Sequence, residues 1–357
     1  MKQPWGVIDT DIHCVENGQA IGKRLPEPHR TRWAAGSRGP GHLGYWNPNG
    51  VMRSDTKLPD GSKIEASPEA IAEHFFDAYG LEYGIFNPGG LHFGVGTDPD
   101  YSAVCCAAIN DTMIEDWLPV DARFRTSCYV APNDPEQAAR EIRRVGSHRG
   151  VVQVMMSSAA RMPYGQRYYY PIYEAACELG LPVAIHPGTE GVGISYPPTP
   201  AGWPTTYFEW HTALACNYIG HLISLVTEGV FIRYPELTFV LVEGGVSWLP
   251  PLLWRLDKNW KALRISTPWL ERPPSELVFE HIKLTTQPIE EPDNLEHLHQ
   301  ILAMFPAERM LMFSTDYPHW DGDTPDFAAR LLPEQIRAAV MSGNARALYK
   351  LPEAVHA

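Results

Sequence analysis

Acidic and imidazole side chains near the start of the chain have the spacing expected of ligands to a single ion. The stretch GVIDTDIH, residues 6–13, places Asp11 and His13 two residues apart at the end of an apolar segment. Residues i and i+2 of a strand point to the same side, so these two side chains project together. The pair could be half of a metal site or simply a polar strand end.

Three later apolar segments also end in residues that could bind a metal or move protons. His186 ends the segment in AIHPG, Glu243 lies in LVEGG, and Asp316 lies in FSTDYPHWD. Singly, such residues are more often helix caps or hydrogen-bonded turn residues. Together, Asp11, His13, His186 and Asp316 would supply two imidazoles and two carboxylates, a set that suits Zn²⁺, Mn²⁺ or Fe²⁺ with an open coordination position.

The elements that would position these residues alternate along the chain. From residue 68 onward, helical patterns alternate with short apolar segments, which makes eight such segments when the opening one is counted. Nearly continuous apolar strands between helices indicate a parallel sheet covered by helices. Eight units predict an α/β fold that closes as a (β/α)8 TIM barrel, whose catalytic groups lie at the carboxyl ends of the strands.

One long stretch after the first strand breaks the alternation. Residues 14–66 are rich in Gly, Pro, Arg and Trp and lack clear periodicity, which is typical of a lid or a binding loop. We therefore predict one domain over residues 1–357, with 14–66 as an insertion that forms either a lid or an interface. Asn87, Asn133, Ser157 and Gln287 end other predicted strands and suit substrate positioning.

The overall composition excludes several classes of partner. The formal net charge of −13 argues against nucleic acid and against an anionic membrane surface. The chain has no run of 18 apolar residues, and its first ten residues lack the apolar core of a signal peptide. Its six cysteines lack zinc-type spacing, which predicts reduced thiols in a cytoplasmic protein. We expect its partner to be a small-molecule substrate.

Five motifs in order give the chain a family resemblance. DTDIH, AIHPG, ELTFVLVEGGVSWLP, MLMFSTDYPHWD and SGNARALYKL, spread over residues 6–351, resemble the amidohydrolase-related group that includes aminocarboxymuconate-semialdehyde, γ-resorcylate and carboxyvanillate decarboxylases. The resemblance implies a barrel with one divalent metal at its mouth, held here by Asp11, His13, His186 and Asp316. We expect zinc, with manganese or iron as alternatives. It also implies a homodimer or a higher homo-oligomer.

Two residues depart from the pattern of these relatives. Asp11 stands where they have His or Glu, and its shorter side chain would bind a metal less closely or through water. Glu243 stands where they have a histidine that helps in proton transfer. In a partly dry pocket the pKa of Glu243 would rise towards neutrality, which suits a proton carrier. Asp316 is the acid/base that we expect first, and His319 is a plausible second one, with capping or packing as its alternative.

Candidate substrate-binding residues follow from the same comparison. Arg255 in LLWRLD resembles an arginine that binds the substrate carboxylate in relatives, sometimes across a subunit contact; an ion pair with Asp257 is the alternative. His211 could face the mouth of the barrel or lie on a helix surface. Trp248, with other tryptophans of the loops, would form a wall for a flat aromatic or unsaturated substrate, unless these residues pack the lid.

Three functions fit these residues. The first is a C–C lyase, a metal-dependent non-oxidative decarboxylase of an aromatic or unsaturated acid. The second is a hydrolase of a C–N, C–O or C–C bond, in which the metal generates hydroxide. The third is a barrel that only binds a ligand, which is disfavoured because all four ligand positions hold residues able to coordinate. VVQVMMSS contains no lysine to bridge two metals, and this favours the lyase.

Overall fold

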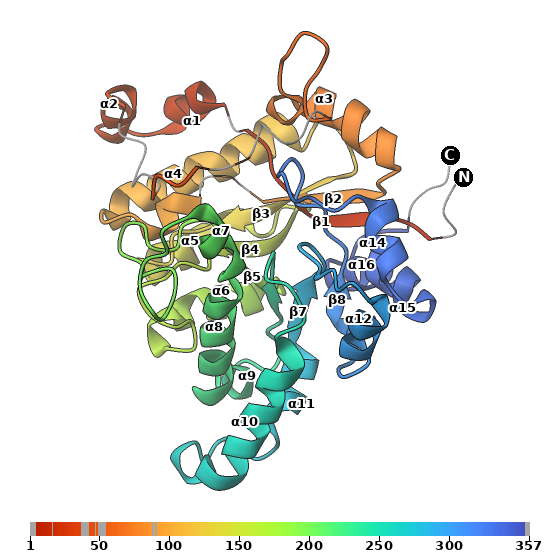
Figure 1. The fold of residues 1–357 in the computed structure, drawn as a ribbon. Helices are drawn as coiled ribbons and strands as arrows, with labels where there is room; N and C mark the ends of the chain where they lie inside the picture. The colour runs from red at the N-terminus through yellow and green to blue at the C-terminus, as the bar shows by residue number, and fades with distance from the viewer. Residues whose placement is uncertain are drawn as a thin grey trace.

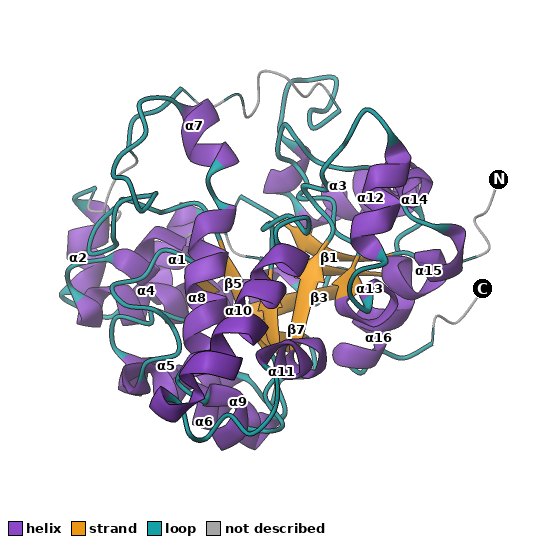
Figure 2. Ribbon diagram, turned by 60° about the horizontal axis from the view of Figure 1, so that its bottom comes forward, coloured by secondary structure: helices purple, strands orange, loops and turns teal. Residues whose placement is uncertain are grey.

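A parallel sheet of eight strands forms the centre of the molecule (Figure 2). The computed structural model describes residues 5–15, 17–36, 43–46, 48, 55–87, 89 and 91–353. The strands follow one another around the sheet in chain order, and each pairs in parallel with the next. They are β1 (Ile8–Ile12), β2 (Tyr83–Phe86), β3 (Phe124–Tyr129), β4 (Val151–Ser157), β5 (Val183–His186), β6 (Phe239–Leu241), β7 (Ile282–Thr285) and β8 (Leu311–Met312).

Backbone hydrogen bonds join β1, the first strand, to the residues that follow β8, the last strand. The amide of Thr10 donates to the carbonyl of Phe313 over 3.0 Å, and the amide of Asp316 donates to the carbonyl of Asp11 over 3.1 Å. Ile12 and Tyr317 form a further parallel bridge. The first and last strands are therefore neighbours, and the predicted (β/α)8 barrel is confirmed.

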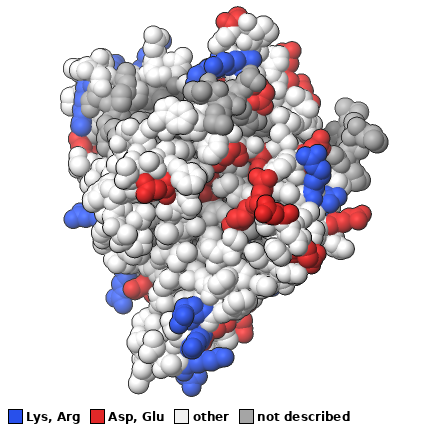
Figure 3. Space-filling model, in the orientation of Figure 1, with Lys and Arg blue, Asp and Glu red and all other residues white. Residues whose placement is uncertain are grey.

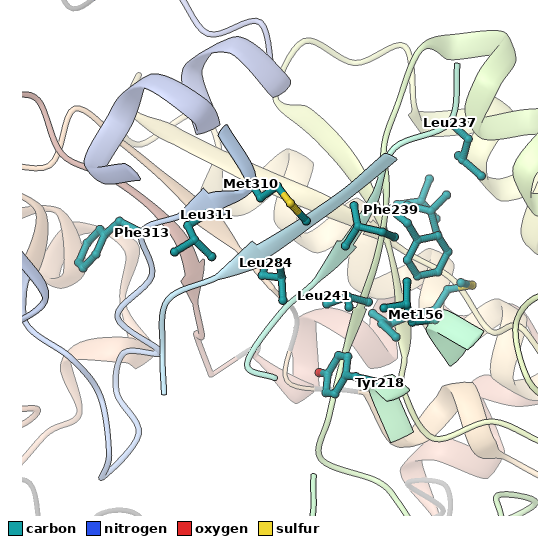
Figure 4. Close-up of a cluster of buried hydrophobic side chains, with 14 of the residues drawn as sticks. Met156, Tyr218, Leu237, Phe239, Leu241, Leu284, Met310, Leu311 and Phe313 are labelled. Atoms are coloured by element: carbon teal, nitrogen blue, oxygen red, sulfur yellow. The ribbon is translucent and has the colours of Figure 1, made fainter. Parts of the chain in front are cut away.

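Apolar strands explain why the sheet is covered on all sides. Every residue of β1, β2, β4, β5 and β6 is buried, as expected of a parallel sheet enclosed by helices. Figure 4 shows one part of the core, where Phe239 and Leu241 of β6, Leu284 of β7 and Leu311 of β8 lie close together. This packed interior fixes the positions of the strand ends, and with them the positions of the polar residues that follow each strand.

The helices surround the sheet (Figure 1), and several begin where the sequence places a cap. Asp98 accepts the amide of Tyr101, and Thr206 forms a capping box with Glu209. Residues 207–233 form three helices, and the last two are separated at Gly229, where the chain turns with φ 76°. The helices are α1 (Gly18–Arg24), α2 (His29–Ala34), α3 (Pro68–Ile71), α4 (Pro99–Thr112), α5 (Pro135–Val145), α6 (Tyr170–Leu179), α7 (Tyr207–Thr212), α8 (Ala215–Thr227), α9 (Val230–Arg233), α10 (Leu249–Leu263), α11 (Pro274–His281), α12 (Leu295–Leu302), α13 (Ala307–Met310), α14 (Pro325–Leu331), α15 (Glu334–Ala338) and α16 (Asn344–Leu348).

The stretch between β1 and α3 is more regular than its sequence suggests. It contains α1 and α2, an antiparallel bridge between Lys57 and Lys63, and a bond from the amide of Val15 to the carbonyl of Glu65 over 2.8 Å. Its last residues therefore return to the end of β1. Residues 16, 37–42, 47 and 49–54 of the predicted insertion lie outside the described residues.

The surface carries the acidic excess of the sequence. On the face shown in Figure 3, Asp and Glu gather towards the middle, whereas Lys and Arg lie nearer the edges and the lower tip. Among the described helices, none is both long and apolar enough to cross a membrane. All six cysteines are free thiols.

Candidate metal and active site

Four ligand-type residues from three strand ends meet at the mouth of the barrel. Asp11 belongs to β1, His13 follows it, His186 ends β5, and Asp316 follows β8. All four are buried, and one ligand atom from each lies within 4.8 Å of the others. The Nε2 atoms of His13 and His186 are 3.1 Å apart, and Asp316 Oδ1 is 3.1 Å from His13 Nε2. The structure thus brings together the four residues predicted to hold a metal.

The hydrogen bonds of the two histidines fix how they face each other. His13 Nδ1 lies 2.9 Å from the carbonyl oxygen of Asn87, and His186 Nδ1 lies 2.7 Å from that of Pro187. A carbonyl can only accept, so each Nδ1 carries a proton and Nε2 is the ring nitrogen left to bind an ion. The two Nε2 atoms therefore face one small space, an arrangement that suits a cation between them.

The carboxylates around this space have oxygens that nothing in the described chain satisfies. Asp11 Oδ2 and Asp316 Oδ1 are buried without a hydrogen-bond donor. Asp11 Oδ2 lies 3.3 Å from His186 Nε2, an atom that carries no proton in the neutral ring. Burial lowers the pKa of His13, but the carboxylates of Asp11 and Asp316 outweigh it and raise that pKa to about 9. The residues fit a divalent metal, which would occupy the position that otherwise attracts a proton.

A buried aspartate that sequence reasoning missed holds the loop carrying Asp316. Asp9, in β1, accepts the amide of Thr315 over 3.0 Å and its hydroxyl over 2.6 Å. Beyond it, Asp316 Oδ2 binds His319 Nδ1 over 2.7 Å, and the ring of His319 stacks on that of His13 at 4.6 Å. The predicted residue His319 therefore reaches the site and faces its open side.

Asn87 is buried behind the ligands rather than facing a substrate. Its side-chain amide donates to Asp11 Oδ1 over 2.7 Å, while its carbonyl accepts from His13 Nδ1. Its own side-chain oxygen accepts from the hydroxyl of Ser127 over 2.6 Å. Asn87 thus orients two ligands at once, a role for which the only sequence signal is its place at the end of a strand.

Glu243 lies beside the metal-ligand set on a strained turn after β6. Its backbone has φ 59°, and Asp316 has φ 53°, values in the left-handed region that non-glycine residues rarely adopt. The amide of Glu243 donates to Thr285 Oγ1 over 2.9 Å, and the hydroxyl of Tyr218 donates to the carbonyl of Val242. These bonds hold Glu243 Oε2 3.3 Å from His186 Nε2.

The other oxygen of Glu243 faces His211, from α7. His211 Nε2 lies 3.8 Å from Glu243 Oε1 and 3.2 Å from Asp321 Oδ2. Gln287 donates to the same carboxylate oxygen of Asp321 over 3.1 Å. His211 therefore faces the site rather than solvent, and Asp321 is a site residue that the sequence analysis did not identify.

Environment separates the two acidic groups that could transfer protons. Burial raises the pKa of Glu243 well above its ordinary value, and the charges of Asp316 and Asp321 raise it further. Burial alone would also raise the pKa of Asp316, but the imidazoles of His319 and His13 outweigh it and hold that pKa well below its usual range. Such a separation is typical of a site with one proton donor and one permanent carboxylate.

A cavity of about 350 Å³ opens above these residues. Glu243, His319, Asp321, Tyr207 and Trp210 line it, and the insertion contributes residues from both of its ends. The lining residues of the insertion are Cys14 and Val15 at its start and Thr56, Lys57, Lys63 and Glu65 near its end. Lys63 pairs with Glu65 over 3.3 Å. The two lysines bring positive charge to an otherwise acidic cavity, and no motif indicated them.

The structure does not bring Trp248 and Arg255 to this cavity. The indole N–H of Trp248 donates to the carbonyl of Gly244 over 2.8 Å, so this side chain fixes the turn that carries Glu243 instead of facing a ligand. Arg255 is exposed on α10 and lines no described part of the cavity.

Two solved structures share this fold over nearly their whole length. One is a dihydroxybenzoic acid decarboxylase from Polaromonas sp. JS666 with bound manganese and the inhibitor 2-nitroresorcinol; it has a TM-score of 0.69, 21% identity, and 98% of both chains covered. The other is 5-carboxyvanillate decarboxylase from Novosphingobium aromaticivorans with manganese and a nitrobenzoic acid, with a TM-score of 0.69, 21% identity, and 98% of this chain and 97% of that chain covered.

Sequence comparison points to the same group. The γ-resorcylate decarboxylase of Polaromonas sp. strain JS666 is 28% identical over 257 residues, which cover 68% of this chain and 75% of the relative. The sequence pattern of the amidohydrolase family matches residues 8–351. Since this match spans almost the entire chain, the protein belongs to the amidohydrolase family.

Proposed function

We propose that this protein is a metal-dependent, non-oxidative decarboxylase of an aromatic carboxylic acid. One observation carries the metal part of the proposal: two imidazole Nε2 atoms lie 3.1 Å apart, beside two buried carboxylate oxygens without a hydrogen-bond partner in the described chain. Asp11, His13, His186 and Asp316 would hold a single divalent ion. Zinc, manganese and iron all suit this set, and the manganese of the two solved relatives makes it the first ion to test alongside zinc.

The bound ion would supply electrophilic stabilisation for the substrate's carboxylate and an adjacent oxygen. Glu243 is the proposed proton donor because it lines the cavity, whereas Asp316 is fully buried and is itself one of the proposed metal ligands. The proton passes from the Glu243 carboxyl to the ring carbon that bears the carboxylate. The C–C bond then breaks, its electron pair restores the aromatic ring, and CO₂ leaves.

The remaining cavity residues have roles that follow from their positions. Lys57 and Lys63 would attract the anionic acid into the cavity, whose other charged lining residues are acidic. His211, with Asp321 behind it, would hold Glu243 Oε1 in place and return a proton to it between turnovers. A cavity of about 350 Å³ suits a single aromatic ring next to the metal.

Oligomerisation and cytoplasmic location stay predictions. Trp254, Leu263 and Ile265, along and after α10, are 59%, 58% and 90% exposed and offer an apolar surface for a homo-oligomer. A neighbouring subunit docked there is also the setting in which Arg255 could contribute to a cavity. Analytical ultracentrifugation measures this directly.

The first test combines elemental analysis with CO₂ release from 2,6-dihydroxybenzoate and 5-carboxyvanillate. We expect about one divalent ion per chain, CO₂ release, and in D₂O one deuterium on the carbon that lost its carboxylate. Glu243→Gln should keep the metal and lose about 10²- to 10⁴-fold in rate, whereas Glu271→Gln, at an exposed position, should behave as wild type.

Other results would overturn this proposal. Metal-loaded protein that releases no CO₂ from a broad panel of aryl acids, yet cleaves amides or esters, would be a hydrolase. Protein that takes up no metal after reconstitution would contradict the ligand assignment itself.

A further inference from the structure

A second cavity lies beside the one that contains the candidate metal ligands. It has a volume of about 710 Å³ and is formed by residues 44–46 and 48, by α7 and the segment before it, and by Trp320. Its principal walls are Tyr45, Trp46, Thr206, Tyr207, Phe208 and Trp320. We call it the aromatic chamber.

The aromatic chamber adjoins the metal cavity. Tyr207 lines both cavities. His211 lines the chamber, and its Nε2 atom lies 3.8 Å from Oε1 of Glu243, which lines the metal cavity. A ligand anchored near Glu243 could therefore extend past Tyr207 and His211 without leaving the protein surface.

The chamber is chemically unlike the cavity it adjoins. Its described lining residues include no Lys, Arg, Asp or Glu, whereas the metal cavity is lined by Lys57, Lys63, Glu65, Glu243 and Asp321. Apart from His211 next to the metal cavity, the described lining of the chamber therefore carries no titratable group of these kinds, and its rings are suited to an uncharged planar group.

The polar atoms of two of these rings, Trp320 and Tyr45, bind other groups of the protein. Trp320 Nε1 lies 3.4 Å from the hydroxyl of Tyr207, and the hydroxyl of Tyr45 donates to the carbonyl of Pro204. Trp46 and Phe208 are 70% and 80% exposed. Apolar side chains clustered in this way at the mouth of a site mark a binding surface more often than isolated ones do.

We propose that the aromatic chamber binds a second, uncharged ring of the substrate whose carboxylate end occupies the metal cavity. The substrate class is then an aryl carboxylic acid that carries a further neutral aromatic group. This inference rests on the proposed function. The shared wall of Tyr207 favours one ligand spanning both cavities over a second copy of this chain covering the chamber.

The test is a calorimetric comparison of salicylate with salicylates that carry a phenyl group at position 4 or 5, on manganese-loaded protein. At least one extended acid should bind about 10- to 100-fold more tightly than salicylate. The double variant Trp46→Ala/Phe208→Ala should abolish that gain while leaving salicylate affinity within about twofold. Trp269→Ala, which removes a partly exposed tryptophan that lines neither cavity, is the matched control and should change neither affinity.

Each other result has a defined meaning. Extended acids that bind no more tightly, or a gain that survives the double variant, would overturn the proposal. A change of oligomeric state in the double variant, with the affinity ratio intact, would assign the surface to a subunit contact instead. The neutral probe 2-naphthol separates the two levels: if it binds in a way that needs Trp46 and Phe208 while no acid binds, the proposed function fails and the chamber's preference for neutral rings stands.

Discussion

Buried histidines occur in two regions of this protein, and their hydrogen bonds differ in kind. His221, in α8, accepts the amide of Tyr164 at Nδ1 over 3.1 Å and donates to the carbonyl of Ser158 at Nε2 over 2.7 Å. His13 and His186 satisfy only Nδ1 with backbone, and their Nε2 atoms face each other. His221 thus has a backbone partner at both ring nitrogens, and we call its surroundings the complete region. Among the described residues, His13 and His186 each have a backbone partner at one ring nitrogen only. We call these two residues the incomplete pair, and their other ring nitrogens indicate where a cation would bind.

Replacing a histidine should abolish metal binding in one region and leave it unchanged in the other. His186→Asn should lower metal content from about one ion per chain to below about a tenth and reduce activity at least about 10³-fold, because a ligand is lost. His221→Gln should retain the metal, since both nitrogens of His221 already have backbone partners. Elemental analysis after gel filtration measures both. Equal metal content in the two variants would contradict the assignment of His186 as a metal ligand and of His221 as a structural residue.

Removing the metal should destabilise the protein through the incomplete pair. Metal present at 1,000 times its Kd would stabilise the folded state by about 4 kcal/mol. Thermal unfolding before and after dialysis against a chelator measures this as a fall in Tm. In Asp11→Asn the fall should be smaller, because the ion loses one charged ligand. An unchanged Tm in wild type would show that the four residues hold no metal in the native protein.

The free energy of unfolding should decrease in acid because of His221 in the complete region. Burial lowers the pKa of His221 to about 4. Below pH 6.5 the unfolded chain takes up a proton at this residue and the folded protein does not, so stability falls as the pH drops from 6.5 towards 4. At pH 5 this amounts to about 2 kcal/mol. Denaturant unfolding at pH 7 and pH 5 should show a smaller difference for His221→Gln than for wild type; equal differences would exclude this titration.

The smallest expected effect concerns the turn beside the incomplete pair. Trp248→Phe removes the indole bond to Gly244 and should cost about 1 kcal/mol of stability. Metal content should stay the same, while the rate of CO₂ release falls a few-fold because Glu243 is held less firmly. Trp254→Phe, on the exposed face of α10, is the control. A drop in metal content in Trp248→Phe would give this residue a closer role at the ligands.

The fold and the four ligand-type residues could be predicted because local patterns carry them. Apolar segments alternate with helical ones in fixed order, so the barrel topology follows from the chain itself, and ligand-type residues at strand ends must converge at one mouth. The positions of Asp11, His13, His186 and Asp316 needed no knowledge of loop geometry beyond this.

The rest of the site depends on contacts between distant segments, which leave no local pattern. Lys57 reaches the cavity because the insertion returns to Val15, a path that its irregular sequence does not reveal. His211 faces Glu243 only because α7 crosses the mouth of the barrel. Trp248 was expected to line the cavity, yet its N–H reaches a nearby backbone carbonyl first.

The left-handed backbone conformations of Glu243 and Asp316 lower the stability of the fold at two positions whose side chains are needed for the proposed reaction. Each costs on the order of 1 kcal/mol or more, and glycine would remove that cost at both positions. A selection for thermostability alone should therefore enrich Glu243→Gly while eliminating the proposed proton donor. In a lineage released from the need for catalysis, position 243 would be among the first to drift to glycine.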